Sequence, residues 1–404
     1  MRVKISPSKI SGKMTAPPSK SMAHRLLVCA ALSSGTSTVK NVAPSEDILA
    51  TLDCISALGA NVEKIGETVK IGGLGGKTAA PRVKLFCRES GSTLRFLIPV
   101  ALSLGCGATF CGSEKLFSRP LEFYEEMCRE RGLDFSRGKN TMTVGGKLSS
   151  GEFTVPGDVS SQFVSGLLFA LPTLSGDSKI TLVGNIESRP YIDMTISALE
   201  KFGVLAEWRR ENEIFVRGGQ TFKSADVTVE GDCSNAAFFE ALNFVGGSVT
   251  VGGIDENTVQ GDKIYGEYFK KLCGGTPELS LADCPDLGPV AFALAAELSG
   301  ATFTHTRRLR QKESDRIASM SEELEKFGAE LDVSEDTVTV KKTALHAPEK
   351  PLSSHNDHRV AMALSVLMTK YGGELSGAEA VKKSMPDFYD VLKSLGAEVE
   401  FYDR

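Results

Sequence analysis

An internal repeat constrains the fold of this chain more than any other feature. An apolar run of helical character ends in glycine at intervals of about 70 residues, with one interval of about 53. Glycine is the residue expected just after a helix end. The glycines are Gly35, Gly105, Gly176, Gly247, Gly300 and Gly373. A single unit of this kind cannot bury its own apolar faces, so neighbouring copies must pack on one another.

Each repeat continues with the same order of expected elements. A short run rich in Thr and Val follows the glycine, as in 36–42 and 179–183, and is typical of a strand. A second helix then ends in a Leu-Gly-Ala or Phe-Gly signature, as at 57–60 and 326–329, and short alternating strands such as 338–340 finish the unit. The sequence therefore predicts an α/β fold of about six βαβαββ repeats.

From the length of the chain, we expect these repeats to form two lobes. A chain of 404 residues exceeds what one hydrophobic core usually supports and suits two domains of about 200 residues, with three repeats each. Extended segments can cross between lobes at Ala16-Pro-Pro-Ser19 and near Val229-Glu-Gly-Asp232. The residues themselves leave open which lobe contains 1–18.

Charge and cysteine usage exclude several classes of protein. A net charge of −5 argues against a nucleic-acid binder, which would show a basic excess. The longest apolar stretches, such as 26–32 and 96–104, are well short of the ~18–20 residues that span a bilayer. Nine scattered cysteines without a Cys-x-x-Cys pair fit free thiols in a reducing compartment. With no leader-like start, we expect a cytoplasmic protein that does not act at a membrane.

The turns that open the first helix of each repeat are rich in polar and charged residues. They are Pro18-Ser-Lys-Ser-Met-Ala-His-Arg25, Glu89-Ser-Gly-Ser-Thr-Leu-Arg95, Asp158-Val-Ser-Ser-Gln162, Gly231-Asp-Cys-Ser-Asn235, Asp283-Cys-Pro-Asp286 and His355-Asn-Asp-His-Arg359. Helix capping accounts for part of the Ser, Asp and Asn content. It does not account for Lys20, Arg25, Arg95, Gln162 or Arg359. Because helix N-termini attract anions, these turns predict phosphate or carboxylate pockets.

A charged stretch before a later helix, Arg310-Gln-Lys-Glu-Ser-Asp-Arg316, has the same character. On a helix, Lys312 and Arg316 lie one turn apart and repel each other unless an anion lies between them. Glu313 beside such a pair suggests acid–base chemistry on an anionic ligand. A solvated helix start with salt bridges is the alternative.

Two further turns add Arg119 and Lys383, which gives an acidic protein about eight cations for one or two sites. Charge-assisted bonds contribute about 1.5–3 kcal/mol each, so four or five suffice for a micromolar ligand and eight imply more than one anionic group. Such cations repel one another without ligand, so we expect an open form whose lobes close when anions bind. The pair His355-x-x-His358 lacks a matching third ligand cluster, so we expect no metal site.

Taken together, these motifs resemble the EPSP synthase family, the 3-phosphoshikimate 1-carboxyvinyltransferases among the enolpyruvyl transferases. The resemblance covers essentially the whole chain. It rests on Pro18-Ser-Lys-Ser-x-x-x-Arg25, Ser90-Gly-Ser-Thr-x-Arg95, Ser160-Ser-Gln162, Arg189-Pro-Tyr-Ile-Asp193, Lys312-Glu-Ser-Asp-Arg316, Asn356-Asp-His-Arg359 and Lys383-Ser-Met-Pro-Asp387.

The resemblance implies a two-lobed inside-out α/β barrel. Residues 19–229 would form the N-terminal lobe, and residues 1–18 plus 230–404 the C-terminal lobe, with two crossover hinges. It also implies transfer of the enolpyruvyl group of phosphoenolpyruvate to the 5-hydroxyl of shikimate 3-phosphate through a tetrahedral intermediate, with release of phosphate. This reaction belongs to the shikimate pathway of aromatic amino-acid biosynthesis and uses no cofactor or metal. We expect a monomer.

Site residues follow from the resemblance motif by motif. The residues implied for shikimate 3-phosphate are Lys20, Ser21, Arg25, Ser160, Ser161, Gln162, Ser188, Tyr191, Asp286 and Lys312. Those implied for phosphoenolpyruvate are Lys20, Gly91, Arg119, Gln162, Arg316, Arg359 and Lys383. Asp286 is our choice of base for the 5-hydroxyl, and Glu313, together with Lys20, our choice for proton transfer at the methylene carbon.

Three positions depart from the family pattern. Glu89 and Arg308 stand where the family commonly has Asn, and Phe96 stands where glyphosate-sensitive members often have Pro, whereas Gly91 is retained. The alternative activity is that of the UDP-N-acetylglucosamine enolpyruvyl transferases, which carry a reactive Cys in the loop that here contains Arg119-Pro120. A phospho-ligand binder without catalysis is a further alternative, which retention of both Asp286 and Glu313 disfavours.

Overall fold

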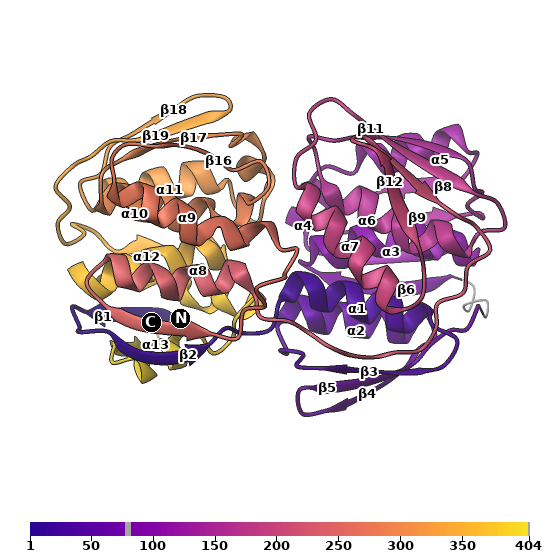
Figure 1. Ribbon diagram of the computed structural model, residues 1–404, viewed down its shortest axis with the longest axis horizontal. Helices are drawn as coiled ribbons and strands as arrows, with labels where there is room; N and C mark the ends of the chain where they lie inside the picture. Colours follow the sequence, from indigo (N-terminus) through magenta and orange to yellow (C-terminus); the bar gives the residue numbers. More distant parts are fainter. Residues whose placement is uncertain (77–81, 403–404) are drawn as a thin grey trace. The chain divides into compact units, whose positions relative to one another are not determined.

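The structure is a computed structural model that describes residues 1–76 and 82–402 (Figure 1). Its contacts divide the chain into two compact units. The N-terminal unit is Pro18–Glu230, and the C-terminal unit combines Met1–Pro17 with Gly231–Arg404. Within the described residues, no helix is both long and apolar enough to cross a membrane.

The N-terminal unit alternates strands and helices from end to end. Its strands are β3 (Thr36–Lys40), β4 (Asn61–Ile65), β5 (Thr68–Gly72), β6 (Val83–Arg88), β7 (Ala108–Gly112), β8 (Asp134–Arg137), β9 (Thr141–Gly145), β10 (Glu152–Pro156), β11 (Ser178–Val183), β12 (Ala206–Arg210), β13 (Glu213–Val216) and β14 (Asp226–Thr228). Its helices are α1 (Lys20–Leu32), α2 (Glu46–Ala57), α3 (Gly91–Leu104), α4 (Glu114–Ser118), α5 (Glu122–Glu130), α6 (Ser161–Ala170), η1 (Leu171–Thr173) and α7 (Arg189–Lys201).

The C-terminal unit follows the same plan. Its strands are β1 (Arg2–Ser6), β2 (Ser11–Thr15), β15 (Ser248–Gly252), β16 (Glu278–Ser280), β17 (Ala301–Thr304), β18 (Leu331–Val333), β19 (Thr337–Val340), β20 (Leu352–Ser353), β21 (Gly373–Ser376) and β22 (Glu398–Tyr402). Its helices are α8 (Cys233–Ala241), η2 (Leu242–Phe244), η3 (Gly261–Ile264), α9 (Tyr265–Cys273), η4 (Pro285–Leu287), α10 (Gly288–Glu297), η5 (Arg307–Gln311), α11 (Arg316–Glu325), α12 (His358–Tyr371), η6 (Ala378–Lys383) and α13 (Phe388–Ser394).

The predicted repeat recurs in the sheets. Five four-stranded sheets share one arrangement, in which the first two strands are parallel and the remaining pairs antiparallel. Their orders are β14-β3-β5-β4, β6-β7-β9-β8, β10-β11-β13-β12, β16-β17-β19-β18 and β20-β21-β1-β22. The expected strands at 36–42, 179–183 and 338–340 are confirmed as β3, β11 and β19.

The repeat between Gly247 and Gly300 lacks two of the predicted strands. Its sheet has two strands, β15 and β2, and the chain passes from β15 through η3 and α9 directly into β16. The two antiparallel strands that end the other repeats are missing from this segment. This loss explains why the interval between Gly247 and Gly300 is about 53 residues instead of about 70.

The first helix of each repeat is enclosed by the rest of its unit. In α10, every residue from Gly288 to Ala296 is buried, and α1, α3 and α12 are buried over nearly their whole length. A helix that is apolar on all sides needs such an environment. In Figure 1 the sheets lie towards the outside of each unit, with these helices among them.

The glycine rule for helix ends holds at some repeats and fails at others. Gly105 ends α3 in the left-handed region with φ 67°. At the first repeat the prediction is wrong, because α1 stops at Leu32 and its C-cap is Ser33, with an extended backbone.

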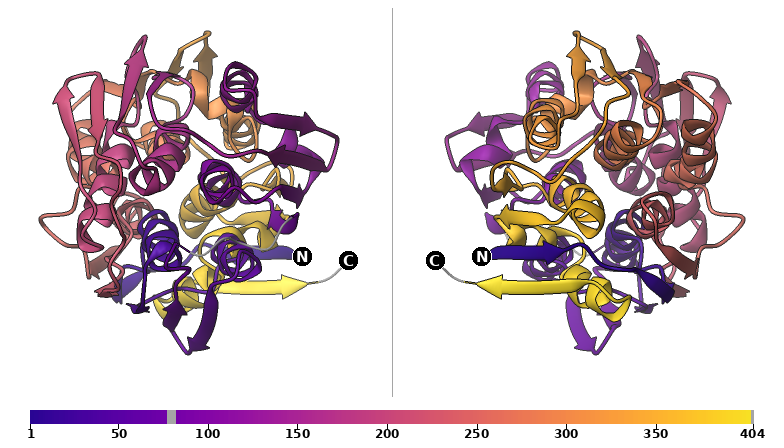
Figure 2. Two further views of the ribbon diagram at one scale, coloured as in Figure 1. Left: turned by 90° about the vertical axis from the view of Figure 1, so that its right-hand side faces the viewer. Right: turned by 90° about the vertical axis from the view of Figure 1, so that its left-hand side faces the viewer.

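The strands β1 and β2 belong to the C-terminal unit although they open the chain. The strand β1 pairs with β21 and β22, with Arg2 opposite Tyr402, and β2 pairs in parallel with β15. Figure 2 shows β1 beside β22 near the two ends of the chain. The chain therefore leaves this unit after β2, builds the N-terminal unit, and returns after β14.

Candidate functional site

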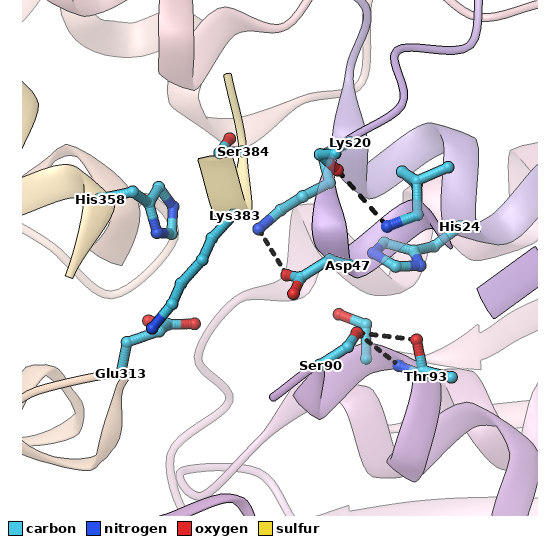
Figure 3. A network of polar contacts seen from close by, with 12 residues as sticks. Lys20, His24, Asp47, Ser90, Thr93, Glu313, His358, Lys383 and Ser384 are labelled. Atoms are coloured by element: carbon cyan, nitrogen blue, oxygen red, sulfur yellow. Dashed lines mark hydrogen bonds and ion pairs between the residues drawn. The ribbon is translucent and has the colours of Figure 1, made fainter. Parts of the chain in front are cut away.

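In the N-terminal unit, the starts of the helices α1 and α2 lie together. The ammonium of Lys20, the first residue of α1, lies 2.9 Å from Oδ2 of Asp47 in the first turn of α2 (Figure 3). Both side chains are largely buried. Ser19 caps α1 by accepting a hydrogen bond from the backbone N–H of Met22. This capped helix start therefore presents a cation whose charge is balanced by an acidic neighbour.

Arg25 is buried one turn further along α1. Its guanidinium donates to the Thr195 hydroxyl at 2.8 Å and to the carbonyl oxygens of Ser21 and Tyr191 at 2.7 Å each. It also lies over the rings of Phe96 and Tyr191, at 5.3 and 6.0 Å from their centroids. Burial lowers the pKa of Arg25 to about 10, which leaves it charged at neutral pH. This network brings the predicted residues Ser21, Arg25 and Tyr191 together.

A second buried arginine joins α3 to α6. Arg95 donates to Oε1 of Gln162 at 2.8 Å and to the carbonyl of Pro120 at 2.9 Å. The amide of Gln162 in turn donates to the Ser92 hydroxyl at 2.9 Å. Arg95 therefore orients Gln162, a function that our sequence-based assignment of site residues left out.

Gly91 opens α3 beside two guanidinium groups. A Cβ atom added there would lie 2.8 Å from Nη1 of Arg119 and 3.1 Å from Nη1 of Arg95. The site thus has room for the Arg119 guanidinium because residue 91 has no side chain. Arg137 donates to the carbonyl of Arg119 at 3.0 Å and fixes the loop that carries it.

Besides Ser21, three predicted serines lie at helix starts. Ser160 caps α6 by accepting from the backbone N–H of Gln162, and Ser161 is buried in its first turn. Ser188 precedes α7 in the left-handed region with φ 57°, an uncommon conformation for a residue other than glycine. Such strain often accompanies function.

In the C-terminal unit, three cations converge on Asp286. Its Oδ1 lies 2.9 Å from Nη1 of Arg316 and 3.4 Å from Nζ of Lys312, and its Oδ2 lies 2.9 Å from Nη2 of Arg359. Burial by itself would raise the pKa of Asp286, but Arg359, Lys312 and Arg316 hold it well below its usual range. The carboxylate is therefore ionised and separates cations that would otherwise repel.

Arg316 is held by three carboxylates. It donates to Asp286, to Glu313 Oε2 at 2.8 Å, and to Asp357 Oδ2 at 2.8 Å. Arg316 is 1% exposed and Asp357 is fully buried. Burial favours loss of the proton, but Asp357, Glu313 and Asp286 raise the pKa of Arg316 above its ordinary value. Asp357 also caps α12 by accepting from the backbone N–H of Arg359 at 2.9 Å.

The predicted helical relationship between Lys312 and Arg316 is wrong. The helix α11 begins at Arg316, and Lys312 is the C-cap that follows η5, with an extended backbone. Asp315 accounts for this start, because its side chain accepts from the backbone N–H groups of Ile317 and Ala318. Contact with Asp286 brings the two cations together instead. The anion between them is a carboxylate of the protein itself, whereas the sequence suggested an anionic ligand.

Lys312 differs from an ordinary lysine. Burial, helped by the cations Arg316 and Arg308 and opposed by Asp286, lowers its pKa to about 8. Lys383 lies in the same unit, where its ammonium donates to the carbonyl of Asn356 at 2.7 Å, and its side chain points towards Glu313 in Figure 3.

Two residues that contact the predicted site residues went unassigned in the sequence. Asp47 stands in an ordinary helix start, Ser45-Glu-Asp, and nothing local indicates its pairing with Lys20. Asp357 belongs to the Asn356-Asp-His-Arg359 motif. An acidic residue this close to the basic residue Arg359 was a signal in the sequence that could have indicated an ion pair.

The departures from the family pattern have structural roles of their own. Arg308 is buried and donates to the carbonyl of Ala282 at 3.0 Å. Phe96 packs in the core with its ring centroid 5.2 Å from that of Phe169. Glu89 is half-buried immediately before Ser90, the N-cap of α3.

His355 and His358 lie in different environments. His355 Nε2 lies 2.8 Å from Oε1 of Glu323, whereas His358 opens α12. Among residues 1–76 and 82–402, the group Glu322, Glu323 and His355 has ligand atoms within 4.8 Å of one another. The Lys326 ammonium already contacts both oxygens of Glu323 at 2.9 Å. This arrangement is a salt-bridge cluster with its own cation.

Comparisons with known proteins agree with one another. The sequence model of the family described as EPSP synthase (3-phosphoshikimate 1-carboxyvinyltransferase) matches residues 5–392. Proteins named 3-phosphoshikimate 1-carboxyvinyltransferase from Clostridium kluyveri and Clostridium acetobutylicum are 41% and 39% identical to this chain, each with 98% of both sequences covered. The 2.37 Å structure of EPSP synthase from Acinetobacter baumannii superposes with a TM-score of 0.81 at 24% identity, covering 99% of this chain and all of that one.

Proposed function

This chain belongs to the EPSP synthase family, and from that premise we propose how its residues carry out the reaction that defines the family. The protein transfers the enolpyruvyl group of phosphoenolpyruvate to shikimate 3-phosphate in the shikimate pathway. The observation that supports our assignment of residues most strongly is the meeting of Lys312, Arg316 and Arg359 at the Asp286 carboxylate.

The finer architecture follows the family. Each unit forms an inside-out α/β barrel of three repeats, with crossovers near residues 16–19 and 229–232 acting as hinges. The protein acts as a monomer in the cytoplasm. The nine free cysteines, seven of them buried, support a reducing compartment.

We assign residues of each unit to the two substrates. In the N-terminal unit, the residues for shikimate 3-phosphate are Lys20, Ser21, Arg25, Ser160, Ser161, Gln162, Ser188 and Tyr191, and those for phosphoenolpyruvate are Lys20, Gly91, Arg119 and Gln162. In the C-terminal unit, Asp286 and Lys312 bind shikimate 3-phosphate, and Arg316, Arg359 and Lys383 bind phosphoenolpyruvate. Capped helix starts and guanidinium groups suit the phosphate and carboxylate groups of these ligands.

Asp286 takes the proton of the 5-hydroxyl as that oxygen attacks phosphoenolpyruvate. In the free protein, its three cations hold the carboxylate ionised but weakly basic. The same cations are the proposed ligands of the substrate anions. When the substrate anions bind, these cations interact with them as well as with Asp286. The pKa of Asp286 therefore rises, and the carboxylate becomes a stronger base for the 5-hydroxyl.

Glu313 and Lys20 transfer the proton at the methylene carbon. Glu313 contacts Arg316 at 2.8 Å, so the guanidinium that binds substrate also orients this carboxyl. The tetrahedral intermediate then releases phosphate as the new methyl group loses a proton to the same pair, which restores the C=C bond, and the surrounding guanidinium groups stabilise the departing charge.

The test is phosphate release from phosphoenolpyruvate by the purified protein. We expect release with shikimate 3-phosphate and none with UDP-N-acetylglucosamine. An Asp286→Asn variant should lose at least about a hundredfold in kcat, as expected when a general base is removed. Normal turnover by this variant would refute the role of Asp286, and release with UDP-N-acetylglucosamine alone would refute the activity.

A further inference from the structure

Four buried polar side chains link three helices of the N-terminal unit. His24 Nδ1 lies 2.7 Å from Thr51 Oγ1, which lies 2.7 Å from Thr93 Oγ1. Thr93 Oγ1 donates to Ser90 Oγ at 2.7 Å (Figure 3). Each of these residues is at most 1% exposed. These hydrogen bonds form a network from α1 through α2 to the cap of α3. The reaction described above uses none of its four residues.

The donors and acceptors of this hydrogen-bond network can be arranged in one way. A hydroxyl has one proton, and that of Thr93 is given to Ser90, so Thr51 must donate to Thr93. Thr51 then accepts from His24, which requires a proton on Nδ1. Burial, followed by the charges of Lys20 and Arg25, lowers the pKa of His24 well below its usual value, so the ring is neutral. The lone pair is therefore on Nε2, a buried atom without a hydrogen-bond partner among the described residues.

The hydrogen-bond network lies next to the ion pair at the starts of α1 and α2. His24 follows Lys20 by four residues, and Thr51 follows Asp47 by four, so each pair shares a helix face. The contacts Lys20–Asp47 and His24–Thr51 are successive links between the same two helices. The contact between Thr51 and Thr93 extends this connection to α3, which begins at Gly91.

We propose that His24 is a positioning residue for the phosphoenolpyruvate site: its Nδ1–H holds α1, α2 and α3 in register, so that Lys20 and the start of α3 at Gly91 keep their places. This inference rests on the proposed function for its kinetic readout. His24 acts through Thr51 and does not touch substrate. The unpaired Nε2 implies that the donor at Nδ1 is what the site requires of this side chain.

The tautomer is tested directly in the wild-type protein by nitrogen NMR with labelled histidine at pH 7. The His24 signal is identified by its absence in a His24→Asn variant. We expect Nδ1 in the protonated region of the spectrum and Nε2 in the unprotonated region. A proton on Nε2, alone or with one on Nδ1, would overturn the proposal whatever the activity of the protein.

Substitutions separate positioning from general destabilisation. The amide nitrogen of asparagine branches at the same carbon as Nδ1, so His24→Asn keeps a donor for Thr51, whereas glutamine places its amide one bond further out. We expect His24→Gln and Thr51→Val to lower kcat/KM for phosphoenolpyruvate about tenfold, as for loss of one buried hydrogen bond. His24→Asn should stay within about threefold of the wild type. The matched control is Thr369→Val, which removes a buried hydroxyl that donates only to the carbonyl of Val366 in its own helix.

The outcomes distinguish the two proposals. Absence of transfer by the wild-type protein would refute the proposed function and leave the NMR result to decide the tautomer. An active wild type with equal losses in His24→Asn and His24→Gln, or with an unaffected Thr51→Val, would refute the positioning role. If His24→Gln does not fold, Thr51→Val and the NMR spectrum decide.

Discussion

The protonation of Lys312 is expected to govern binding near neutral pH. Its pKa is lowered to about 8 in the free protein, mainly by burial. Below this pH the ammonium is charged and binds the shikimate 3-phosphate anion, and above it the charge is lost. We expect kcat/KM for shikimate 3-phosphate to fall about tenfold per pH unit above pH ~8, measured by phosphate release.

The control for this prediction is Lys312→Arg, which keeps a positive charge throughout that pH range. The fall near pH ~8 should disappear in this variant, even if its activity at pH ~7 is lower. An unchanged inflection in Lys312→Arg would assign the titration to another group.

Arg316 is expected to contribute strongly to the stability of the C-terminal unit. It neutralises Asp357, which is fully buried and caps α12. Arg316→Met leaves this charge buried and unpaired, and we expect a loss of about 3–5 kcal/mol in the stability of the C-terminal unit. Hydrogen exchange of α12 amides and thermal unfolding followed by circular dichroism measure the loss. Fluorescence of Trp208, the chain's one tryptophan, should show an unchanged transition for the N-terminal unit.

The matched control is Arg310→Met at the edge of the same segment. Arg310 lies 3.4 Å from Asp315, and both side chains are about one-third exposed. A pair of this kind contributes at most about 1 kcal/mol, so the variant should unfold close to the wild type. Equal losses in the two arginine variants would contradict the buried-charge explanation.

At the scale of elements, the start of α3 shows how a helix sets a binding site. A Cβ at residue 91 would approach the Arg119 guanidinium to 2.8 Å, and a flexible side chain can move away from such a contact. We therefore expect Gly91→Ala to fold normally, to raise KM for phosphoenolpyruvate about tenfold, and to change KM for shikimate 3-phosphate less than twofold. Steady-state kinetics with each substrate varied in turn measure both constants.

Gly266→Ala is the control for this helix position. Gly266 lies in the first turn of α9, and nothing lies within 4 Å of an added Cβ. Alanine there should leave both KM values unchanged and slightly stabilise the helix. A comparable rise in KM from Gly266→Ala would show that the loss at Gly91 does not depend on Arg119.

The elements also mark the limit of prediction from sequence. The helices and strands of the repeat follow from glycines, caps and alternation, which are local signals, and the charged turns at helix starts are visible for the same reason. The partners of those turns are not local. Asp47 meets Lys20 across 27 positions and Thr195 meets Arg25 across 170, so these contacts depend on how whole repeats pack.

The whole molecule differs from its repeat pattern where the chain passes between units. The strand β2 belongs to the sheet of β15, and β14 to the sheet of β3, although each is followed in the chain by a helix of the other unit. The proline-containing joint at 16–19 was visible in the sequence. The residues themselves did not show which unit contains 1–18, because strand pairing over more than 200 positions has no local signal in the sequence.

This pairing predicts that the C-terminal unit needs the first 17 residues to fold. The strand β1 lies between β21 and β22, and its buried residues Val3 and Ile5 belong to the core of this unit, as does Ile10. Each contributes about 1.5–3 kcal/mol by burial, comparable in sum with the stability of a whole domain. A fragment of residues 231–404 should therefore lack a cooperative thermal transition by circular dichroism, whereas a fragment of residues 18–230 should unfold cooperatively.

A circular permutant tests whether strand pairing is the reason. Arg2 pairs with Tyr402 across antiparallel strands, so a short Gly/Ser linker can join the C-terminal end of residues 231–404 to Met1 of residues 1–17 as a hairpin. We expect this permutant to regain a cooperative transition, because it restores β1 between β21 and β22 and β2 beside β15. Cooperative unfolding of the 231–404 fragment without the added strands would contradict this account, since the unit would then fold without two of its strands.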